Sequence, residues 1–253
     1  MITLNNKTAL ISGAARGQGK AMASLFVALG ANVVIADILV EEGAALAREL
    51  GEKCRFQPLD VTAKAEWENA IMLAEKAFGG LDILVNNAGI IKVGSIEDMS
   101  EDDFMQVIRT NLLGCFLGMQ VATPVLRRSG NASIINISST AGIEGVPGAS
   151  AYVASKFGVR GISRAAALEL GHAGIRVNAV HPGLIDTDMV NAPEFANANR
   201  AGTVAALPIP RIGEPVDVAH FVAFLASDAA SYCTGAEYLV DGGSMAGGPL
   251  EPR

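Results

Sequence analysis

Near its start the chain reads Thr8-Ala9-Leu10-Ile11-Ser12-Gly13-Ala14-Ala15-Arg16-Gly17-Gln18-Gly19. Its first residues form an apolar run of strand length, and a helical pattern follows over residues 20–29. The glycines at positions 13, 17 and 19 let the backbone between them turn tightly and approach a ligand closely. Free N–H groups at the start of the helix favour a pyrophosphate. The spacing is G-x-x-x-G-x-G and not G-x-G-x-x-G, yet the order of strand, glycine loop and helix predicts nucleotide binding.

A second apolar strand, residues 32–36, ends at Asp37. A carboxylate at this position can accept hydrogen bonds from the ribose hydroxyls of an adenosine cofactor, and it repels a 2′-phosphate. Asp37 therefore favours NAD over NADP.

Short apolar runs alternate with helical patterns along all 253 residues, and no linker or block of charge divides them. This alternation predicts right-handed βαβ units in one domain over residues 1–253: a Rossmann-type, doubly wound parallel sheet of about seven strands with helices on both faces. We expect strands over residues 9–11, 33–36, 55–58, 83–85, 133–137, 176–180 and 237–240. We expect helices over residues 20–29, 41–50, 63–78, 101–128, 152–170 and 216–225.

Composition excludes several classes of protein. The formal net charge of −7 and the absence of a basic stripe argue against nucleic-acid binding. No apolar run reaches the roughly 18 residues of a membrane span. Residues 1–7 lack the basic and then apolar layout of a secretory signal, so we expect a cytoplasmic protein. Cys54, Cys115 and Cys233 are odd in number and far apart, which predicts buried thiols and not disulfides. His172, His181 and His220 have no metal-ligand spacing, and we expect no metal site.

Tyr152 and Lys156 lie four residues apart in a predicted helix, which places both side chains on one face. A lysine ammonium near a phenol stabilises the phenolate and lowers the pKa of the tyrosine from about 10. Such a tyrosine can exchange a proton with an alcohol oxygen near neutral pH. By itself, a Tyr/Lys pair at this spacing is usually a surface contact.

The ordered set of motifs resembles the short-chain dehydrogenase/reductase family over essentially the whole chain. The matching segments are Ser12–Gly19 (with Ser12 where threonine is usual), Asp60-Val61, Asn86-Asn87-Ala88-Gly89, Asn111, Ser139, Tyr152 with Lys156, Pro182-Gly183 and Thr187. The serine–tyrosine separation, 152 − 139 = 13, also matches the family.

This resemblance implies a catalytic tetrad of Asn111, Ser139, Tyr152 and Lys156. Ser139 would bond the substrate oxygen and Tyr152 would take its proton. Lys156 would lower the pKa of Tyr152 and bond the cofactor ribose, and Asn111 would hold a relay water. The implied cofactor-binding residues are Gly13, Arg16, Gly17, Gln18, Gly19, Asp37, Asp60, Val61, Asn87, Ala88, Gly89, Tyr152, Lys156, Pro182, Gly183, Ile185 and Thr187.

Four of these residues have plainer interpretations. Ser138 is a rival to Ser139, which could simply cap a turn. Asn111 could be a buried polar residue, Asn87 could join two strands, and Asp60 could bond only local backbone.

Arg16 conflicts with the preference for NAD, because family members that use NADP often carry a base at this position. Asp37 should face the ribose itself, and the residues after it, Ile38, Leu39 and Val40, add no second base. We therefore expect NAD, with NADP as the less favoured cofactor.

The segment at about 184–215 should cover the substrate, and it includes apolar Met189, Phe195, Leu207 and Ile209. Besides Ser139, we expect the substrate to contact Ile91, Ile143, Val146 and Met189. Glu144 is the one obvious charged residue among those expected near the substrate. The expected substrate is therefore an apolar secondary alcohol or ketone.

The chain is most similar to the bacterial 3α/20β-hydroxysteroid and secondary-alcohol dehydrogenase branch of the family. A reductase of 3-oxoacyl carrier-protein substrates is the alternative enzyme. A non-catalytic nucleotide-sensing protein is the alternative outside the enzymes.

The helical segment 101–128 is apolar almost all round. The segment 152–170 carries small residues at Ala154, Gly158, Gly161 and Ala165. Helices too apolar for a single buried face often pack against another subunit. With the resemblance, this predicts a homotetramer. Residues 244–253, which are rich in glycine and proline, could be loose or could cap a neighbouring subunit's site.

Overall fold

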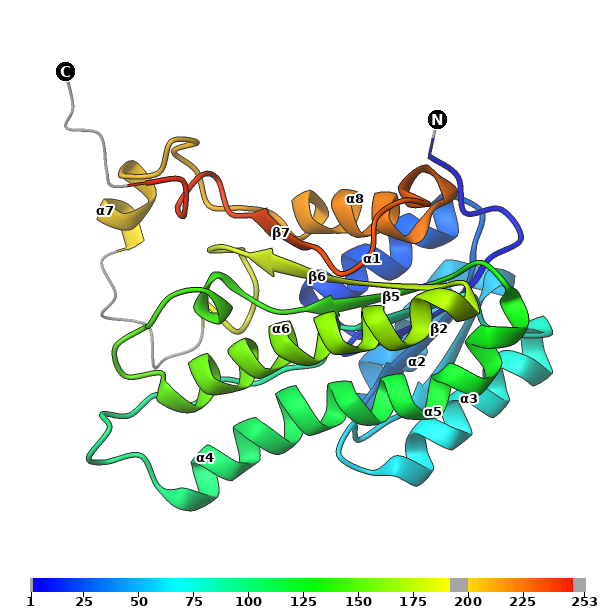
Figure 1. Ribbon diagram of the computed structural model, residues 1–253, viewed down its shortest axis with the longest axis horizontal. Coiled ribbons are helices and arrows are strands. Elements are labelled where there is room, and N and C mark those ends of the chain that lie inside the picture. The colour runs from blue at the N-terminus through cyan, green and yellow to red at the C-terminus, as the bar shows by residue number, and fades with distance from the viewer. Residues whose placement is uncertain (1, 192–199, 248–253) are drawn as a thin grey trace.

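The computed structural model describes residues 2–191 and 200–247, which form one parallel seven-stranded sheet with helices on both faces (Figure 1). The sheet order is β3-β2-β1-β4-β5-β6-β7, and every neighbouring pair is parallel. The predicted fold class is confirmed. The strands are β1 (Thr8–Ser12), β2 (Asn32–Asp37), β3 (Cys54–Pro58), β4 (Ile83–Asn86), β5 (Ala132–Ile137), β6 (Ile175–Pro182) and β7 (Glu237–Val240).

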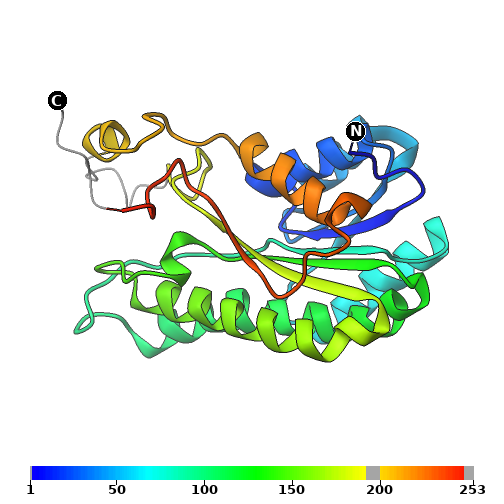
Figure 2. The ribbon, with the colours of Figure 1, turned by 45° about the horizontal axis from the view of Figure 1, so that its top comes forward.

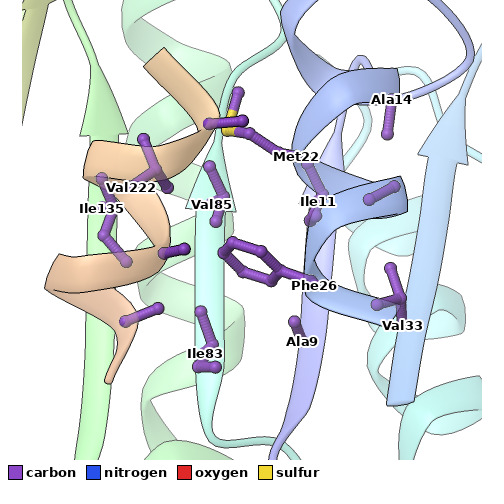
Figure 3. Close-up of a cluster of buried hydrophobic side chains, with 14 of the residues drawn as sticks. Ala9, Ile11, Ala14, Met22, Phe26, Val33, Ile83, Val85, Ile135 and Val222 are labelled. Carbon is purple, nitrogen blue, oxygen red and sulfur yellow. The ribbon is translucent and has the colours of Figure 1, made fainter. Parts of the chain in front are cut away.

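Two helical layers enclose the sheet (Figure 2). One layer holds α1 (Gly17–Ala28), α2 (Val40–Leu50) and α8 (Pro215–Ala226), and the other holds α3 (Lys64–Phe78), α5 (Gly114–Ser129) and α6 (Ser150–Leu170). In the first layer, Phe26 and Met22 of α1 and Val222 of α8 pack over the central strands (Figure 3). Strands β1, β4 and β5 are buried along their whole length, which explains why their sequences are mostly apolar.

Strand order reverses between β1 and β4, which lie side by side in the middle of the sheet. In open parallel sheets, ligands bind outside the carboxyl ends of the strands at this reversal. The glycine loop follows β1, Asp37 ends β2, and Asn87 follows β4, so all three lie at that edge.

The predicted helix over 101–128 is interrupted. It consists of α4 (Glu101–Ile108), a π-helical turn over Arg109–Leu113 and then α5. Asn111 lies in the π turn, and its side chain bonds the backbone of Ile90 outside the helix. Single π turns of this kind occur often at functional sites.

The segment expected to cover the substrate contains the short helix α7 (Arg200–Ala205). Phe195 lies outside the described residues. Short 3₁₀ turns occur at Gly51–Lys53, Thr140–Gly142, Gly171–Ala173 and Asp228–Ala230.

Within residues 2–191 and 200–247, no helix is long and apolar enough to cross a membrane. No group of three or more His, Cys, Asp or Glu side chains in these ranges could hold a metal ion. All three cysteines are free thiols; Cys54 and Cys115 are buried, whereas Cys233 is only partly so.

Candidate active site

The glycine loop is held against the end of β4. The Asn87 side chain donates from Nδ2 to the carbonyls of Ser12 and Gly13, at 3.0 and 2.9 Å. The Ser12 hydroxyl in turn accepts the backbone N–H groups of Asn87 and Ala88, at 3.1 and 3.2 Å. Asn87 therefore joins the ends of β1 and β4, which was its plainer interpretation. The residue also lines a cavity at this edge of the sheet.

Two glycines in the loop are required by geometry. Gly13 has a φ of 63°, and a Cβ there would lie 2.7 Å from the Cα of Ala88. A Cβ on Gly19 would lie 2.2 Å from the carbonyl oxygen of Gly13, which is closer than any real contact. The backbone is thus folded onto itself where α1 begins.

Substituting alanine for Gly19 should therefore displace the loop. We expect Gly19→Ala to weaken cofactor binding by at least about tenfold and to lower the melting temperature, because backbone atoms block the methyl group. Calorimetric titration with NAD⁺ measures the first effect and thermal unfolding the second. Gly80→Ala is the matched control, since a Cβ there meets nothing within 4 Å. Unchanged binding in Gly19→Ala would contradict the role assigned to the loop.

A cavity of about 650 Å³ opens at the reversal of strand order. Its lining unites predicted cofactor-binding residues from five separate parts of the chain: Gly13, Arg16, Gly17, Gln18, Asp37, Asp60, Val61, Asn87, Ala88, Gly89 and Thr187. Met189, predicted for the substrate, lines the same cavity.

One wall of this cavity was missed by the sequence reasoning. It comes from α4 and the π turn, and consists of Glu101, Asp102, Met105, Gln106, Arg109 and Thr110. The sequence gives one indication of this wall, because these six residues lie within the ten positions before Asn111 on the same predicted helix.

The residues of the cavity fit an adenine dinucleotide. The start of α1 faces it, and there the Gln18 side-chain oxygen Oε1 is buried with no hydrogen-bond partner in the part of the chain that the structure describes. A buried polar atom without a partner is costly, so a bound polar group would satisfy it. The volume lies in the range of known ligand pockets.

Two of the carboxylates that line the cavity, Asp37 and Asp60, also hold local backbone. Asp37 is 8% exposed, and its oxygens accept the N–H groups of Ala15 and Leu39 at 2.9 and 3.0 Å. Asp60 accepts both the N–H and the hydroxyl of Thr62 at 2.8 Å. The plain interpretation of Asp60 is thus correct but incomplete.

Tyr152 and Lys156 lie on one face of α6, as their spacing predicts. The Lys156 Nζ atom is 5.5 Å from the centre of the Tyr152 ring and donates to the Ile137 carbonyl at 2.9 Å. Lys156 is 4% exposed, and burial lowers its pKa to about 8.

The prediction of a lowered tyrosine pKa is wrong for this structure. Burial raises the pKa of Tyr152 above its usual value, and the hydrogen bond with the Ser139 hydroxyl offsets this only in part. The sequence reasoning counted the lysine charge and missed the burial. The lysine also faces the ring and bonds a carbonyl, and it is itself partly discharged near pH 8.

Of the two neighbouring serines, only Ser139 faces the tyrosine. The Ser138 side chain is buried and donates to the Lys156 carbonyl at 3.0 Å. The Ser139 hydroxyl accepts from the N–H of Ala141 at 3.1 Å and interacts with the phenol of Tyr152. Ser139 therefore caps a turn and contacts Tyr152 as well.

The Asn111 side chain joins three segments. Its Nδ2 donates to the Ile90 carbonyl at 2.9 Å and to the Ser155 hydroxyl at 3.0 Å, and its Oδ1 accepts the Ile90 N–H at 2.8 Å. A Cβ on Gly89 would lie within 3.5 Å of both Asn111 and Lys156. Asn111 and Lys156 thus lie against Gly89, which lines the cavity, and Lys156 is next to Tyr152, which bonds Ser139; none of these four side chains lines the cavity itself.

The remaining predicted residues are more scattered. Pro182 ends β6, Gly183 packs against Asp241, and Ile185 is buried; these three do not line the cavity. Ile91 and Ile143 are partly buried, and Val146 is 41% exposed; they do not line it either.

Arg16 is tied to the covering segment. Its guanidinium forms a 3.3 Å ion pair with Asp188, next to Thr187, and both charged side chains are exposed. This pair connects the glycine loop to the chain after β6.

The sequence is similar to those of known proteins across nearly their entire length. Residues 13–245 match the family model described as enoyl-(acyl carrier protein) reductase. The chain is 47% identical to the 3-alpha-(or 20-beta)-hydroxysteroid dehydrogenase of Mycobacterium tuberculosis, over 96% of this chain and 91% of that protein. It is 44% identical to the trans-4-hydroxycyclohexanecarboxylate dehydrogenase of Sinomonas cyclohexanicum, over 96% and 95%. It is 41% identical to the 3-oxoacyl-(acyl-carrier-protein) reductase of Thermotoga maritima, over 95% and 98%.

The chain belongs to the short-chain dehydrogenase/reductase family. It is an oxidoreductase of that family, whose members use a nicotinamide cofactor.

Proposed function

We propose that this protein is an NAD-dependent dehydrogenase of apolar secondary alcohols, acting in reverse on the corresponding ketones. The observation that supports the proposal is the group of Tyr152, the Ser139 hydroxyl and the Lys156 ammonium, which adjoins through Gly89 the cavity lined by the glycine loop and Asp37. Ile91, Ile143, Val146 and Met189 are proposed to contact the substrate, and all four are apolar. Two relatives are named as dehydrogenases of cyclic secondary alcohols, one of a hydroxysteroid and the other of trans-4-hydroxycyclohexanecarboxylate.

The proposed chemistry divides the work among the four side chains. The Ser139 hydroxyl donates to the substrate oxygen and holds it beside Tyr152. The phenolate of Tyr152 takes the hydroxyl proton during oxidation and returns it during reduction. The nicotinamide cofactor, when bound, supplies the hydride acceptor or donor. Lys156 keeps two N–H groups after its bond to Ile137, and these are available for the cofactor ribose.

Asn111 is proposed to serve the same site in two ways. Its three hydrogen bonds fix Ile90 and Ser155 around the tetrad. Its Oδ1 has a second lone pair, which would accept a hydrogen bond from the relay water expected from the resemblance.

The substrate class is tested with purified protein by following the absorbance of reduced nicotinamide. The secondary alcohols would increase in size from 2-butanol through cyclohexanol to 3α- and 20β-hydroxysteroids, each with NAD⁺ and with NADP⁺. We expect NAD-linked turnover that is faster for the cyclic alcohols. Turnover of 3-oxoacyl thioesters alone would instead support the reductase alternative, which the Thermotoga maritima relative favours. Binding of NAD⁺ without turnover of any substrate would contradict the dehydrogenase and favour the sensing role.

The proposed preference for NAD has its own test in Asp37→Asn. The neutral side chain no longer repels a 2′-phosphate, so the ratio of kcat/KM for NADP⁺ over NAD⁺ should rise by at least about tenfold. The ratio is the correct readout, because the lost backbone bond to Ala15 or Leu39 weakens both cofactors. Asp60→Asn, at a second carboxylate of the cavity, is the control and should leave the ratio unchanged. An unchanged ratio in Asp37→Asn would overturn the assignment of cofactor preference to this residue.

The proposed assembly is a homotetramer. Apolar side chains on the π turn, α5 and α6 are exposed in the single chain, including Leu113, Phe116, Phe157 and Leu168. Within this chain, Gly158 lets α6 approach Leu112 closely, whereas Ala154, Gly161 and Ala165 remain exposed. Light scattering of the purified protein tests the tetramer. The cytoplasmic location stays a prediction from the sequence.

A further inference from the structure

His181 is a buried side chain that the proposed chemistry does not use. It is the penultimate residue of β6 and has no exposed surface. Its Nδ1 lies 2.8 Å from the carbonyl oxygen of Ser139. A carbonyl oxygen only accepts hydrogen bonds, so Nδ1 carries the hydrogen and donates it.

This bond continues the contact between β5 and β6 past the end of the backbone ladder. The last paired residues are Ile137 and Val180, and the last backbone bond runs from the Ser138 N–H to the Val180 carbonyl at 2.7 Å. Beyond that point the chain leaves β5, with Ser139 in an extended conformation before the Thr140–Gly142 turn. The imidazole of His181 supplies the next link and holds the backbone of Ser139 itself.

The other ring nitrogen, Nε2, makes no hydrogen bond within the described residues that would favour a polar side chain at this buried position. Nε2 is buried and has no hydrogen-bond partner among residues 2–191 and 200–247. An apolar side chain of similar size would avoid the cost of this unpaired acceptor. The bond to Ser139 is therefore the interaction that compensates for burying the ring.

The ring is neutral in this environment. Burial lowers the pKa of His181. The hydrogen bond to the Ser139 carbonyl and the charge of Glu237 act in the opposite direction, whereas the charges of Arg160 and Lys156 reinforce the lowering. A neutral imidazole with the hydrogen on Nδ1 is a fixed donor toward Ser139 at neutral pH.

We propose that His181 is a positioning residue that fixes the backbone of Ser139 and thereby aims the Ser139 hydroxyl at the substrate oxygen beside Tyr152. The proposal rests on the proposed role of Ser139. A shift of the Ser139 backbone moves its hydroxyl by a similar amount, and small misplacements at a reacting centre have large effects on rate.

The test compares two substitutions at this position. His181→Leu keeps most of the volume and removes the donor, whereas His181→Asn keeps an N–H donor at the same number of bonds from Cα. For oxidation of the best alcohol from the panel, kcat should fall about tenfold in His181→Leu and return to within about threefold of wild type in His181→Asn. The KM for NAD⁺ should stay unchanged in both. Equal losses in the two variants would overturn the proposal.

A double-mutant cycle with Ser139→Ala separates positioning from general damage. If His181 acts through the Ser139 hydroxyl, His181→Leu should lower kcat by less than about twofold once that hydroxyl is gone. A further tenfold loss in the Ser139→Ala background would overturn the proposal. Asn178→Leu is the matched control, because Asn178 is equally buried on β6 but donates to the Cys233 carbonyl. It should lower the melting temperature and leave kcat within about twofold at 25 °C.

The same cycle distinguishes failure of this inference from failure of the proposed function. If Ser139→Ala alone keeps full activity, the role of Ser139 in the chemistry is wrong, and the role of His181 fails with it. If Ser139→Ala is impaired while His181→Leu is not, the proposed function stands and only the positioning role is lost.

Discussion

Replacing Tyr152 with phenylalanine should lower kcat for alcohol oxidation by about 10²–10⁴-fold while the affinity for NAD⁺ changes by less than about twofold. The substitution removes one oxygen atom, the one proposed to take the substrate proton. The ring that packs 5.5 Å from the Lys156 ammonium remains, so the shape of the site is preserved. Steady-state rates from the absorbance of reduced nicotinamide, together with calorimetric binding of NAD⁺, measure the two effects separately.

Tyr238→Phe is the matched control for the loss of a phenol. Tyr238 is partly buried on β7, and burial together with the Cys233 thiol raises its pKa to about 12. Its ring packs against Phe221 of α8, in the opposite layer from Tyr152. We expect this variant to keep wild-type kcat. Full activity in Tyr152→Phe would exclude Tyr152 as the proton acceptor and leave Ser139 as the nearest hydroxyl for that role.

The fold was predictable because its determinants are local. The strands β1, β4 and β5 are buried on both sides, so their sequences are mostly apolar and mark their own bounds within a residue or two. The glycine loop is local only in part. Gly19 is required by contacts with Gly13 and Ala14 in the same turn, whereas Gly13 is required by the close approach of Ala88, which follows β4.

The misses have long-range causes. The π turn at Arg109–Leu113 depends on bonds between Asn111 and Ile90, which are 21 residues apart, and no helical periodicity records them. The raised pKa of Tyr152 depends on burial, which only the assembled structure shows. No local pattern in the sequence marks His181, because its partner Ser139 is 42 residues away. Spacing finds residues that act along one helix, and tertiary contacts decide the environment in which they act.

The second large effect is expected for Lys156→Met, which keeps the length of the side chain and removes its charge. A cation 5.5 Å from the centre of the Tyr152 ring favours the phenolate and so opposes the rise that burial causes in the pKa of Tyr152. Without it, less Tyr152 is in the base form at a given pH, so kcat/KM for oxidation at pH 7 should fall at least about tenfold. The variant should remain folded. The substitution removes a charged group that burial disfavours, and it costs the hydrogen bond from Lys156 to the Ile137 carbonyl.

The dependence on pH distinguishes a charge effect from a loss of packing. Burial lowers the pKa of Lys156 to about 8, so the wild-type ammonium is present below this pH and is lost above it. The advantage of wild type over Lys156→Met in kcat/KM should therefore be full below pH 8 and should shrink as pH rises beyond it. Rates of both proteins measured from pH 6 to pH 10 give this ratio directly. A ratio that stays constant across the range would show that Lys156 acts by holding the cofactor or the Ile137 carbonyl, and not by its charge on the phenol.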